Sequence, residues 1–309
     1  MGTSASRTVA PPPPSDNSLR SAEHATSNTN SNSPSTSNFT MQTPSSESTK
    51  TSESAPTVIH GYTFPQDKLK RRLQKPGQTP LVLVACGSFS PITILHLQLF
   101  ELAERYVERS DKFEIVGCYV SPCSDTYGKS SLVASSHRIN MCKLAIEENG
   151  SNIMIDEWEA VRKDSDGSPV YTPTSDVLRR LDDQLNNVLG GIETADGSST
   201  VKAKVMLLMG ADLAQTMSDP NIWAPADIDV LLGYYGGFIV ERPDQCDINK
   251  AIEPLRKHQP PYNIFVVPSF PNDVSSTKIR AQLRNGERAL DLPESVFDYI
   301  QKHGLYRDS

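Results

Sequence analysis

The sequence predicts an α/β domain built on a parallel sheet, and three observations support this fold class. Apolar runs of strand length alternate with segments of helical periodicity, which is typical of strand–helix–strand units. Residues 81–86 are an unbroken run of Leu, Val, Ala and Cys, as expected of a strand buried on both faces. Once an N-terminal tail is set aside, about 250 residues remain, which is enough for one domain with a full core.

The expected elements follow one another along the chain. The first strand ends at Gly87, and a helix follows because four large side chains recur at spacings of four, three and four: Leu95, Leu99, Leu102 and Tyr106. Further strands are expected at 114–120, 153–157, 205–209, 238–240 and 263–267. Further helices are expected at 136–148, at 175–189, from Ser275 to Gly286 and from Pro293 to His303. A Gly- and Ser-rich connector at 190–200 indicates a surface insertion.

Residues 1–57 are predicted to form a disordered arm. They contain 15 serines, 10 threonines and four consecutive prolines, but only five large apolar side chains. That is too little apolar surface to offset the entropy of ordering the chain. Residues 58–79 are interpreted as a basic linker and residues 80–309 as the folded domain. The basic cluster of the linker indicates either a solvated helix face or a nuclear-import signal, and it consists of Lys68, Lys70, Arg71, Arg72 and Lys75.

Charge and cysteine content restrict the class of protein. Thirty Lys and Arg against 37 Asp and Glu give a formal net charge of −7, which disfavours a protein that coats DNA or RNA but leaves room for a local anion pocket. The five cysteines are odd in number and lack CxxC spacing, which favours a reducing compartment. No run approaches the ~18 apolar residues that cross a bilayer, and no signal peptide is recognisable. We therefore expect a soluble intracellular protein without nucleic-acid or membrane partners.

A first candidate site follows the first strand. Residues 87–96 read Gly-Ser-Phe-Ser-Pro-Ile-Thr-Ile-Leu-His and span the strand end and the helix start. Ligands of open parallel sheets bind at the carboxyl ends of strands, where a helix N-terminus offers N–H groups to an anion such as phosphate. Gly87 permits close backbone approach, and Pro91 fixes the entry to the helix. His96 lies on the same helix face as Thr93 and can donate to a charged oxygen; an ordinary core histidine is the alternative.

A second segment, Ser275-Ser276-Thr277-Lys278-Ile279-Arg280, places cations in the first turn of a helix. Hydroxyl residues are common helix caps, but the helix dipole favours acidic rather than basic residues in the first turn. A bound anion would reverse that preference, and Arg280 could offer paired donors to phosphate oxygens. The two segments together therefore indicate a phosphate-binding site.

The motifs GSFSPxTxxH and SSTKIR resemble the two signatures of the nucleotidyltransferase superfamily in the form found in eukaryotic nicotinamide mononucleotide adenylyltransferases. The likeness runs from about residue 80 to 307 and includes the segments 120–122, 136–138, 208–213, 221–223 and 271–273. It implies a Rossmann-like, doubly wound catalytic domain at 80–309. It also implies transfer of the adenylyl group of ATP to nicotinamide mononucleotide, and to the nicotinate analogue, giving NAD or deamido-NAD and pyrophosphate. Ser90 replaces an asparagine of many relatives, and we expect the loop to stay intact.

The resemblance assigns roles residue by residue. His96, at the reacting phosphate, and Arg280 would be catalytic. ATP contacts are assigned to Gly87, Ser88, Phe89, His96, Arg242, Asn272, Thr277, Lys278, Ile279 and Arg280. Contacts to the mononucleotide or NAD are assigned to Ser88, Phe89, Lys129, Tyr171, Thr174, Gly210, Asp212, Ile222, Trp223 and Arg242. Trp223 would stack on the nicotinamide ring, with core packing as the alternative for Trp223 and Tyr171.

The resemblance also implies a mechanism without an enzyme nucleophile. Catalysis would consist of positioning and charge neutralisation. A divalent cation, usually Mg²⁺, would bridge phosphate oxygens and need no dedicated carboxylate cage. We expect a homo-oligomer located in the nucleus, the cytoplasm or both. The alternatives are a related cytidylyl- or pantetheine-phosphate adenylyltransferase, and a nonenzymatic interaction protein that retains the fold.

Overall fold

A six-stranded parallel sheet forms the centre of the computed structural model, which describes residues 62–127, 131–242, 247–269 and 274–307. The strand order is β3-β2-β1-β6-β7-β8, and all neighbours pair in parallel. The strands are β1 (Thr79–Gly87), β2 (Phe113–Pro122), β3 (Ile153–Ile155), β6 (Lys204–Gly210), β7 (Gly237–Val240) and β8 (Ile264–Val267). The chain runs outward from β1 to β3 and returns to β6, so the strand order reverses between β1 and β6. The predicted doubly wound α/β fold is confirmed.

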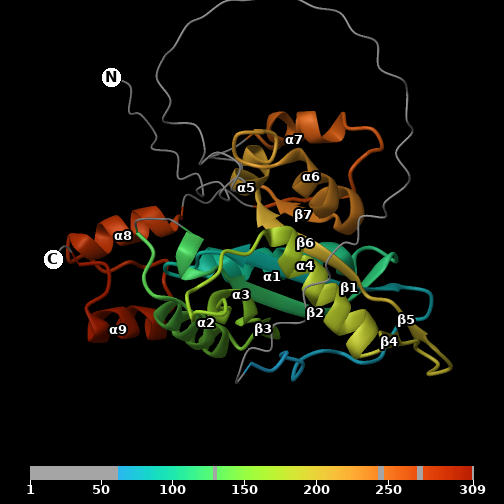
Figure 1. Cartoon of the computed structure of the whole chain (residues 1–309), viewed down its shortest axis with the longest axis horizontal. Helices are drawn as coiled ribbons and strands as arrows, with labels where there is room; N and C mark the ends of the chain where they lie inside the picture. Colours follow the sequence, from blue (N-terminus) through green and yellow to red (C-terminus); the bar gives the residue numbers. More distant parts are fainter. Residues whose placement is uncertain (1–61, 128–130, 243–246, 270–273, 308–309) are drawn as a thin grey trace, which may run out of the picture.

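Helices cover both faces of this sheet (Figure 1). The helices are α1 (Ile94–Glu108), α2 (Ser135–Asn149), α3 (Trp158–Val161), α4 (Thr174–Asp183), α5 (Ala211–Thr216), α6 (Pro225–Ile228), α7 (Ile248–Arg256), α8 (Ser276–Arg284) and α9 (Glu294–His303). The buried residues of α1, α2, α8 and α9 form one core with one sheet face. Those of α4, α5 and α7 form a second core with the other face.

Strand β1 is buried between these two cores. Leu81 and Leu83 belong to one core, and Val82 and Val84 to the other. Side chains of a strand alternate between the two faces of the sheet, so a strand with both faces covered must be apolar at every position. The continuous apolar run predicted this buried location. Because both faces of β1 are packed, the position of Gly87 at the end of the strand is fixed.

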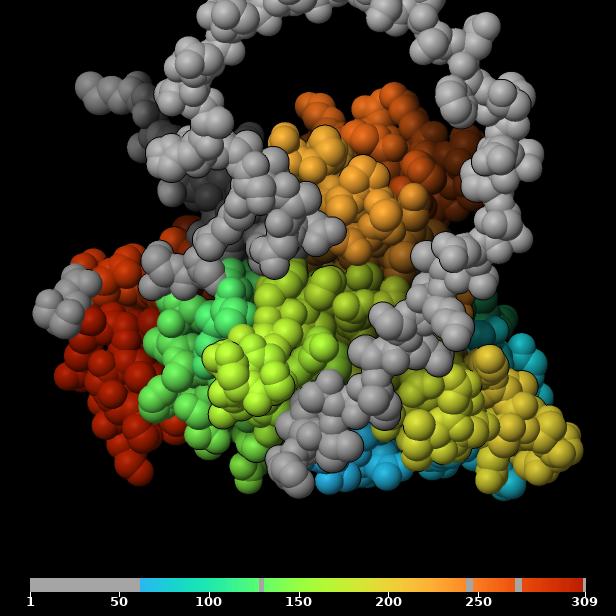
Figure 2. All heavy atoms as spheres, viewed as in Figure 1, coloured from blue at the N-terminus to red at the C-terminus, as the bar shows by residue number. Residues whose placement is uncertain are grey.

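The basic segment before β1 is part of the domain rather than a linker. From residue 62 onward it runs over the surface in turns and extended stretches, without a helix, and buries Phe64, Leu69 and Leu73 in one of the two cores. Figure 2 shows this segment in blue along the lower edge of the domain. Its three apolar side chains offset the entropy of ordering the segment, which the charge-based interpretation did not take into account. The predicted arm at 1–57 lies outside the described residues.

The connector at 190–200 is a small hairpin held by this basic segment. Its strands β4 (Ile192–Glu193) and β5 (Thr200–Val201) pair antiparallel. Arg72 Nε forms an ion pair with Glu193 at 2.9 Å, and Arg71 Nη2 donates to the carbonyl of Leu189 at 2.6 Å. Two of the predicted cluster's cations are therefore used to dock the segment.

Among the described residues, no helix combines the length and the apolar character that crossing a membrane requires.

If the segment that precedes β1 belongs to the domain, shortening one of its buried side chains should destabilise the whole domain. We expect Leu73→Ala to lower the free energy of unfolding by about 2–4 kcal/mol, because it removes buried methyl groups and leaves a cavity. Leu290→Ala is the matched control: Leu290 is 79% exposed, and its truncation should change stability by less than about 0.5 kcal/mol. Urea denaturation measures both variants. Equal stability of the two variants would contradict the assignment.

Candidate active site

The two sequence motifs, far apart in the chain, meet at the carboxyl edge of the sheet. Ser276 Oγ, at the start of α8, donates to the carbonyl of Pro91 at 3.1 Å. Arg280 Nη1 donates to the carbonyl of Ser90 at 2.7 Å. Both acceptors belong to the loop between β1 and α1, which we call the β1–α1 loop (residues 88–93). The predicted convergence of the motifs is confirmed, and it lies beside the point where the strand order reverses.

The start of α1 fixes the tautomer of His96. Thr93 is the N-cap residue, and its backbone N–H donates to His96 Nδ1 at 3.0 Å. Because a backbone N–H can only donate, Nδ1 must be the acceptor, and the neutral ring then carries its proton on Nε2. The Thr93 hydroxyl also lies 2.8 Å from Nδ1. The imidazole is thus held at one nitrogen, with the other in the donor form that a phosphate oxygen requires.

Phe89 supports His96 from inside the protein. Its ring is buried and lies edge-on to the His96 ring, with centroids 5.2 Å apart. It also covers Gly87, where an added Cβ would lie 3.4 Å from the Phe89 ring. The Phe89 backbone has φ +43°, an uncommon conformation for a residue with a side chain. Any contact of Phe89 with a nucleotide would therefore involve its main chain.

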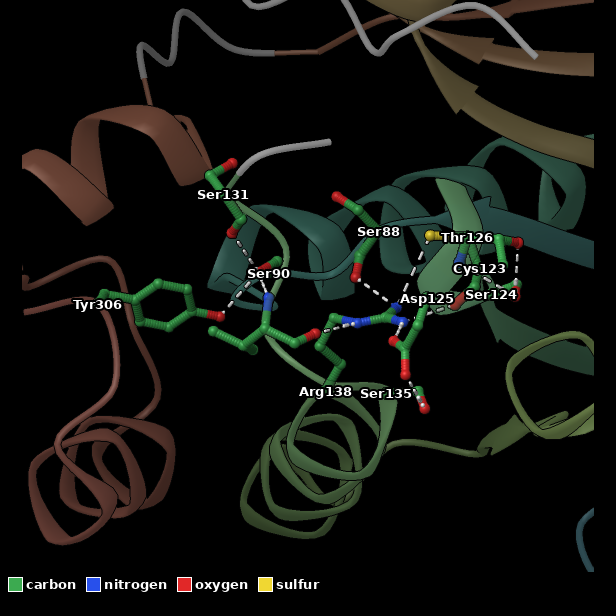
Figure 3. A network of polar contacts seen from close by, with 11 residues as sticks. Ser88, Ser90, Cys123, Ser124, Asp125, Thr126, Ser131, Ser135, Arg138 and Tyr306 are labelled. Carbon is green, nitrogen blue, oxygen red and sulfur yellow. Dashed lines mark hydrogen bonds and ion pairs between the residues drawn. The ribbon is translucent and has the colours of Figure 1, made fainter. Parts of the chain in front are cut away.

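A buried arginine from α2 holds the other end of the β1–α1 loop. Arg138 is 0% exposed, and its guanidinium donates to the carbonyls of Ser88 at 3.0 Å, Cys123 at 2.7 Å and Val133 at 2.9 Å (Figure 3). It also forms a 2.8 Å ion pair with Asp125. A guanidinium offers five N–H donors and is costly to bury unless they are satisfied, so its position depends on these backbone oxygens.

The capture of the Ser88 carbonyl has a consequence for the peptide that follows it. The Ser88–Phe89 peptide bond is trans, so its N–H points opposite to its C=O. With the carbonyl directed toward Arg138, the Phe89 N–H is directed away from the protein interior formed by α2. This orientation suits an N–H that contacts an anion.

Helix α8 carries the predicted triphosphate contacts in three different environments. Ser275 caps the helix by accepting from the Lys278 N–H at 3.2 Å, and the Lys278 side chain is exposed. Ile279 is buried in the core, so only its main chain could reach ATP. Arg280 is 5% exposed, and its Nη2 donates to Thr277 Oγ1 at 2.9 Å. Burial lowers the pKa of Arg280, but an arginine remains charged in proteins.

Arg280 therefore points into the protein and is shared between the β1–α1 loop and its own helix. The two Nη groups of its guanidinium were expected to face phosphate oxygens. Instead, Nη1 donates to the Ser90 carbonyl and Nη2 donates to Thr277 Oγ1. A direct phosphate contact stays a prediction. The structure shows a further role of Arg280, which is to bind the β1–α1 loop to α8.

The end of β6 brings together Gly210, Asp212 and Arg242, which were assigned separately. Arg242 follows β7, forms an ion pair with Asp212 and donates through Nη2 to the carbonyl of Val274 at 2.6 Å. Within the described residues, Arg242 Nε and Asp212 Oδ1 are buried without a hydrogen-bond partner.

Three residues assigned to the mononucleotide, Tyr171, Thr174 and Trp223, lie near the start of α4 and before α6. Ser175 Oγ donates to Asp227 at 3.2 Å, which ties these two helices together near Tyr171, Thr174 and Trp223. Trp223 is 8% exposed, belongs to the core and donates its indole N–H to Thr216 Oγ1 at 3.0 Å. Core packing, the alternative role considered for Trp223, thus buries most of its surface. Stacking of Trp223 on a ligand ring and the role of Ile222 stay predictions.

Glu159 on α3 was not found by sequence reasoning. It is 5% exposed and accepts from Ser121 Oγ at 3.3 Å. Burial raises the pKa values of Tyr127 and Tyr171, and the charge of the nearby Glu159 raises both further. Burial raises the pKa of Glu159 to about 8, so the carboxyl is mostly protonated at neutral pH and can donate a hydrogen bond. The sequence signal that could have identified Glu159 is its position between the apolar residues Trp158 and Ala160, which indicates a buried carboxyl.

Two assigned residues, Lys129 and Asn272, lie outside the described residues. Across the four described ranges, no group of three or more His, Cys, Asp and Glu side chains is placed to hold a metal ion.

Sequence comparisons agree with this geometry. A family described as cytidylyltransferase-like matches residues 84–282. Nicotinamide/nicotinic acid mononucleotide adenylyltransferase 1 of Saccharomyces cerevisiae is 42% identical over 260 residues, covering 81% of this chain and 61% of the yeast protein. The Schizosaccharomyces pombe enzyme of the same name is 40% identical, covering 81% and 67%. Adenylyltransferase 1 of Bos taurus is 35% identical, covering 76% and 91%. The chain thus spans about three fifths of the budding-yeast relatives.

A structural comparison supports the fold. Plasmodium falciparum nicotinic acid mononucleotide adenylyltransferase, solved with NaAD, superposes with a TM-score of 0.50 at 19% identity, covering 74% of this chain and 97% of that protein. The superposition supports the fold, and the family match and the sequence relatives give the assignment: the chain belongs to the cytidylyltransferase-like nucleotidyltransferases, among the relatives of the nicotinamide/nicotinic acid mononucleotide adenylyltransferases.

Proposed function

We propose that the protein transfers the adenylyl group of ATP to nicotinamide mononucleotide or nicotinate mononucleotide, forming NAD or deamido-NAD and releasing pyrophosphate. The observation that carries this proposal is the junction of the β1–α1 loop with α8: Ser276 and Arg280 bind the loop that leads into α1, the helix that carries His96. The names of relatives at 35–42% identity support the same reaction. Both pyridine forms are included because those names include both.

The reaction needs no covalent intermediate with the protein. A phosphate oxygen of the mononucleotide attacks the α-phosphorus of ATP, a new P–O bond forms, and the bond to the β-phosphate oxygen breaks as pyrophosphate leaves. The His96 Nε2–H would donate to an oxygen on which negative charge develops. The N-terminus of α1 and the exposed Lys278 would add positive potential at the same place.

A divalent cation, usually Mg²⁺, belongs to this proposal. Because the described residues provide no cluster of ligands for it, phosphate oxygens and water would supply most of its coordination. Bound there, it would neutralise charge on the polyphosphate. The protein's own part is to orient the phosphates between the β1–α1 loop and α8.

The alternative nucleotidyltransferase reactions are less well supported. The cytidylyltransferase-like family is broad, but the relatives reported above all carry mononucleotide adenylyltransferase names. A nonenzymatic role is disfavoured because the relatives reported above carry enzyme names and because His96 is held in the tautomer that can donate from Nε2. A homo-oligomeric state and a location in the nucleus or cytoplasm stay predictions.

The direct test is an assay of the purified protein with Mg²⁺, ATP and nicotinamide or nicotinate mononucleotide. We expect equal amounts of dinucleotide and pyrophosphate, since each transfer releases one of each. Chromatography and a coupled pyrophosphate assay measure the two products. Formation of a CDP-linked product from CTP, with no NAD, would instead favour a cytidylyltransferase.

The His96 assignment is tested by His96→Asn. The asparagine oxygen can still accept from the Thr93 N–H, so the start of α1 should be kept while the Nε2–H donor is lost. We expect kcat to fall by at least about two orders of magnitude, with little change in melting temperature. Steady-state kinetics and circular dichroism measure the two effects. Full activity in His96→Asn would reject the role of His96.

A further inference from the structure

Ser90, in the middle of the β1–α1 loop, is contacted by the far C-terminal end of the chain. Ser90 is completely buried, and its Oγ lies 2.9 Å from the hydroxyl of Tyr306. The same Oγ lies 3.1 Å from the Ser131 carbonyl and 3.3 Å from the Val133 N–H. In Figure 3 the Tyr306 ring points toward Ser90 from the side opposite to Arg138.

The direction of the Tyr306 hydrogen bond follows from its neighbours. The Ser131 carbonyl can only accept, so it takes the single proton of Ser90 Oγ. The Val133 N–H can only donate to Ser90. The Tyr306 hydroxyl is therefore the donor to Ser90. Burial raises the pKa of Tyr306, so the hydroxyl keeps its proton at neutral pH.

The backbone at the C-terminus adopts a rare conformation to make this contact. Helix α9 ends at His303 and is capped by Gly304, which has φ +60°, and the Leu305 N–H donates back to the Ile300 carbonyl at 3.1 Å. Tyr306 then has φ +61°, in the left-handed region that residues with a side chain seldom enter. Such a conformation persists only when tertiary contacts fix it, and here they are ring packing against the core and the bond to Ser90.

Tyr306 and Arg280 act on the same residue from different elements. Arg280 binds the Ser90 carbonyl at 2.7 Å, and Tyr306 donates to the Ser90 side chain. Val133 adds a further link, since its N–H bonds Ser90 and its carbonyl bonds Arg138. The carbonyl and the side chain of Ser90 are therefore both held, by α8, by the segment that precedes α2 and by the C-terminal segment.

We propose that Tyr306 is a positioning residue for adenylyl transfer: its hydroxyl holds Ser90, and through it the β1–α1 loop, in the conformation that presents the loop and His96 to the reacting phosphates. This role rests on the proposed function. Tyr306 is not placed in contact with substrate, so its removal should slow the chemical step more than it weakens binding of the mononucleotide.

The test compares two hydroxyl deletions near the C-terminus. Tyr306→Phe keeps the ring packing and removes only the donor to Ser90. Tyr299→Phe removes a hydroxyl from α9 whose partners are His137 and Asn140. With saturating Mg²⁺–ATP and varied nicotinamide mononucleotide, we expect Tyr306→Phe to lower kcat by about three- to tenfold while KM changes by less than about twofold. Tyr299→Phe should match the wild type in both constants.

A double-mutant cycle shows whether Tyr306 acts through Ser90. If it does, Tyr306→Phe should cost little further activity in a Ser90→Ala background, because the acceptor of its bond is already gone. Amide hydrogen exchange adds a readout independent of turnover: exchange in residues 88–96 should accelerate in Tyr306→Phe and not in Tyr299→Phe.

The outcomes separate this inference from the proposed function. An active wild type with unchanged kcat in Tyr306→Phe would overturn the positioning role alone. Fully additive losses in the double mutant would also overturn it. A wild-type protein that forms no dinucleotide would overturn the proposed function, and the positioning role with it.

Discussion

The structure depends on the capture of two loop carbonyls by two buried guanidinium groups. Arg138 binds the Ser88 carbonyl and Arg280 binds the Ser90 carbonyl, from helices on either side of the β1–α1 loop. Burying a cation costs several kcal/mol unless its donors are satisfied, and the loop supplies acceptors that few other conformations would offer. The arginines and the loop therefore require one another. The Phe89 N–H takes its direction from the captured Ser88 carbonyl, and His96 is held at the end of the same loop by the Thr93 N–H.

The topology of the sheet explains why the two captured carbonyls lie at the candidate active site. Parallel strands end at a common edge, and open sheets of this kind bind ligands where the strand order reverses, which is here between β1 and β6. Strand β1 is covered on both faces, so the loop begins from a rigid point at Gly87. Helix α8 comes late in the sequence but lies at this edge, where Ser276 joins it to Pro91. Relatives at 40–42% identity are named as mononucleotide adenylyltransferases, in keeping with this arrangement.

Sequence reasoning predicted the strands and helices around the site better than the partners of its buried polar side chains. The apolar run of β1 and the spacing of α1 gave the strand, the loop and the helix, because periodicity reports which faces are buried. The convergence of the motifs followed from strand ends sharing an edge. Periodicity does not report the partner of a buried polar group, so the inward direction of Arg280, the burial of Arg138 and the contact of Tyr306 with Ser90 were not foreseen. The docking of residues 62–79 was not predicted because the basic residues indicated a solvated segment, whereas its three apolar side chains are buried in the core.

The central claim is that one polyphosphate binds between the β1–α1 loop and α8. A crystal structure of the full chain with Mg²⁺ and a non-hydrolysable ATP analogue tests it most directly. The account predicts that the triphosphate lies between these two elements, with a phosphate oxygen within hydrogen-bond distance of His96 Nε2 and with Arg280 still bound to the Ser90 carbonyl. A triphosphate bound elsewhere on the domain, or one that displaces Arg280 from Ser90, would contradict it.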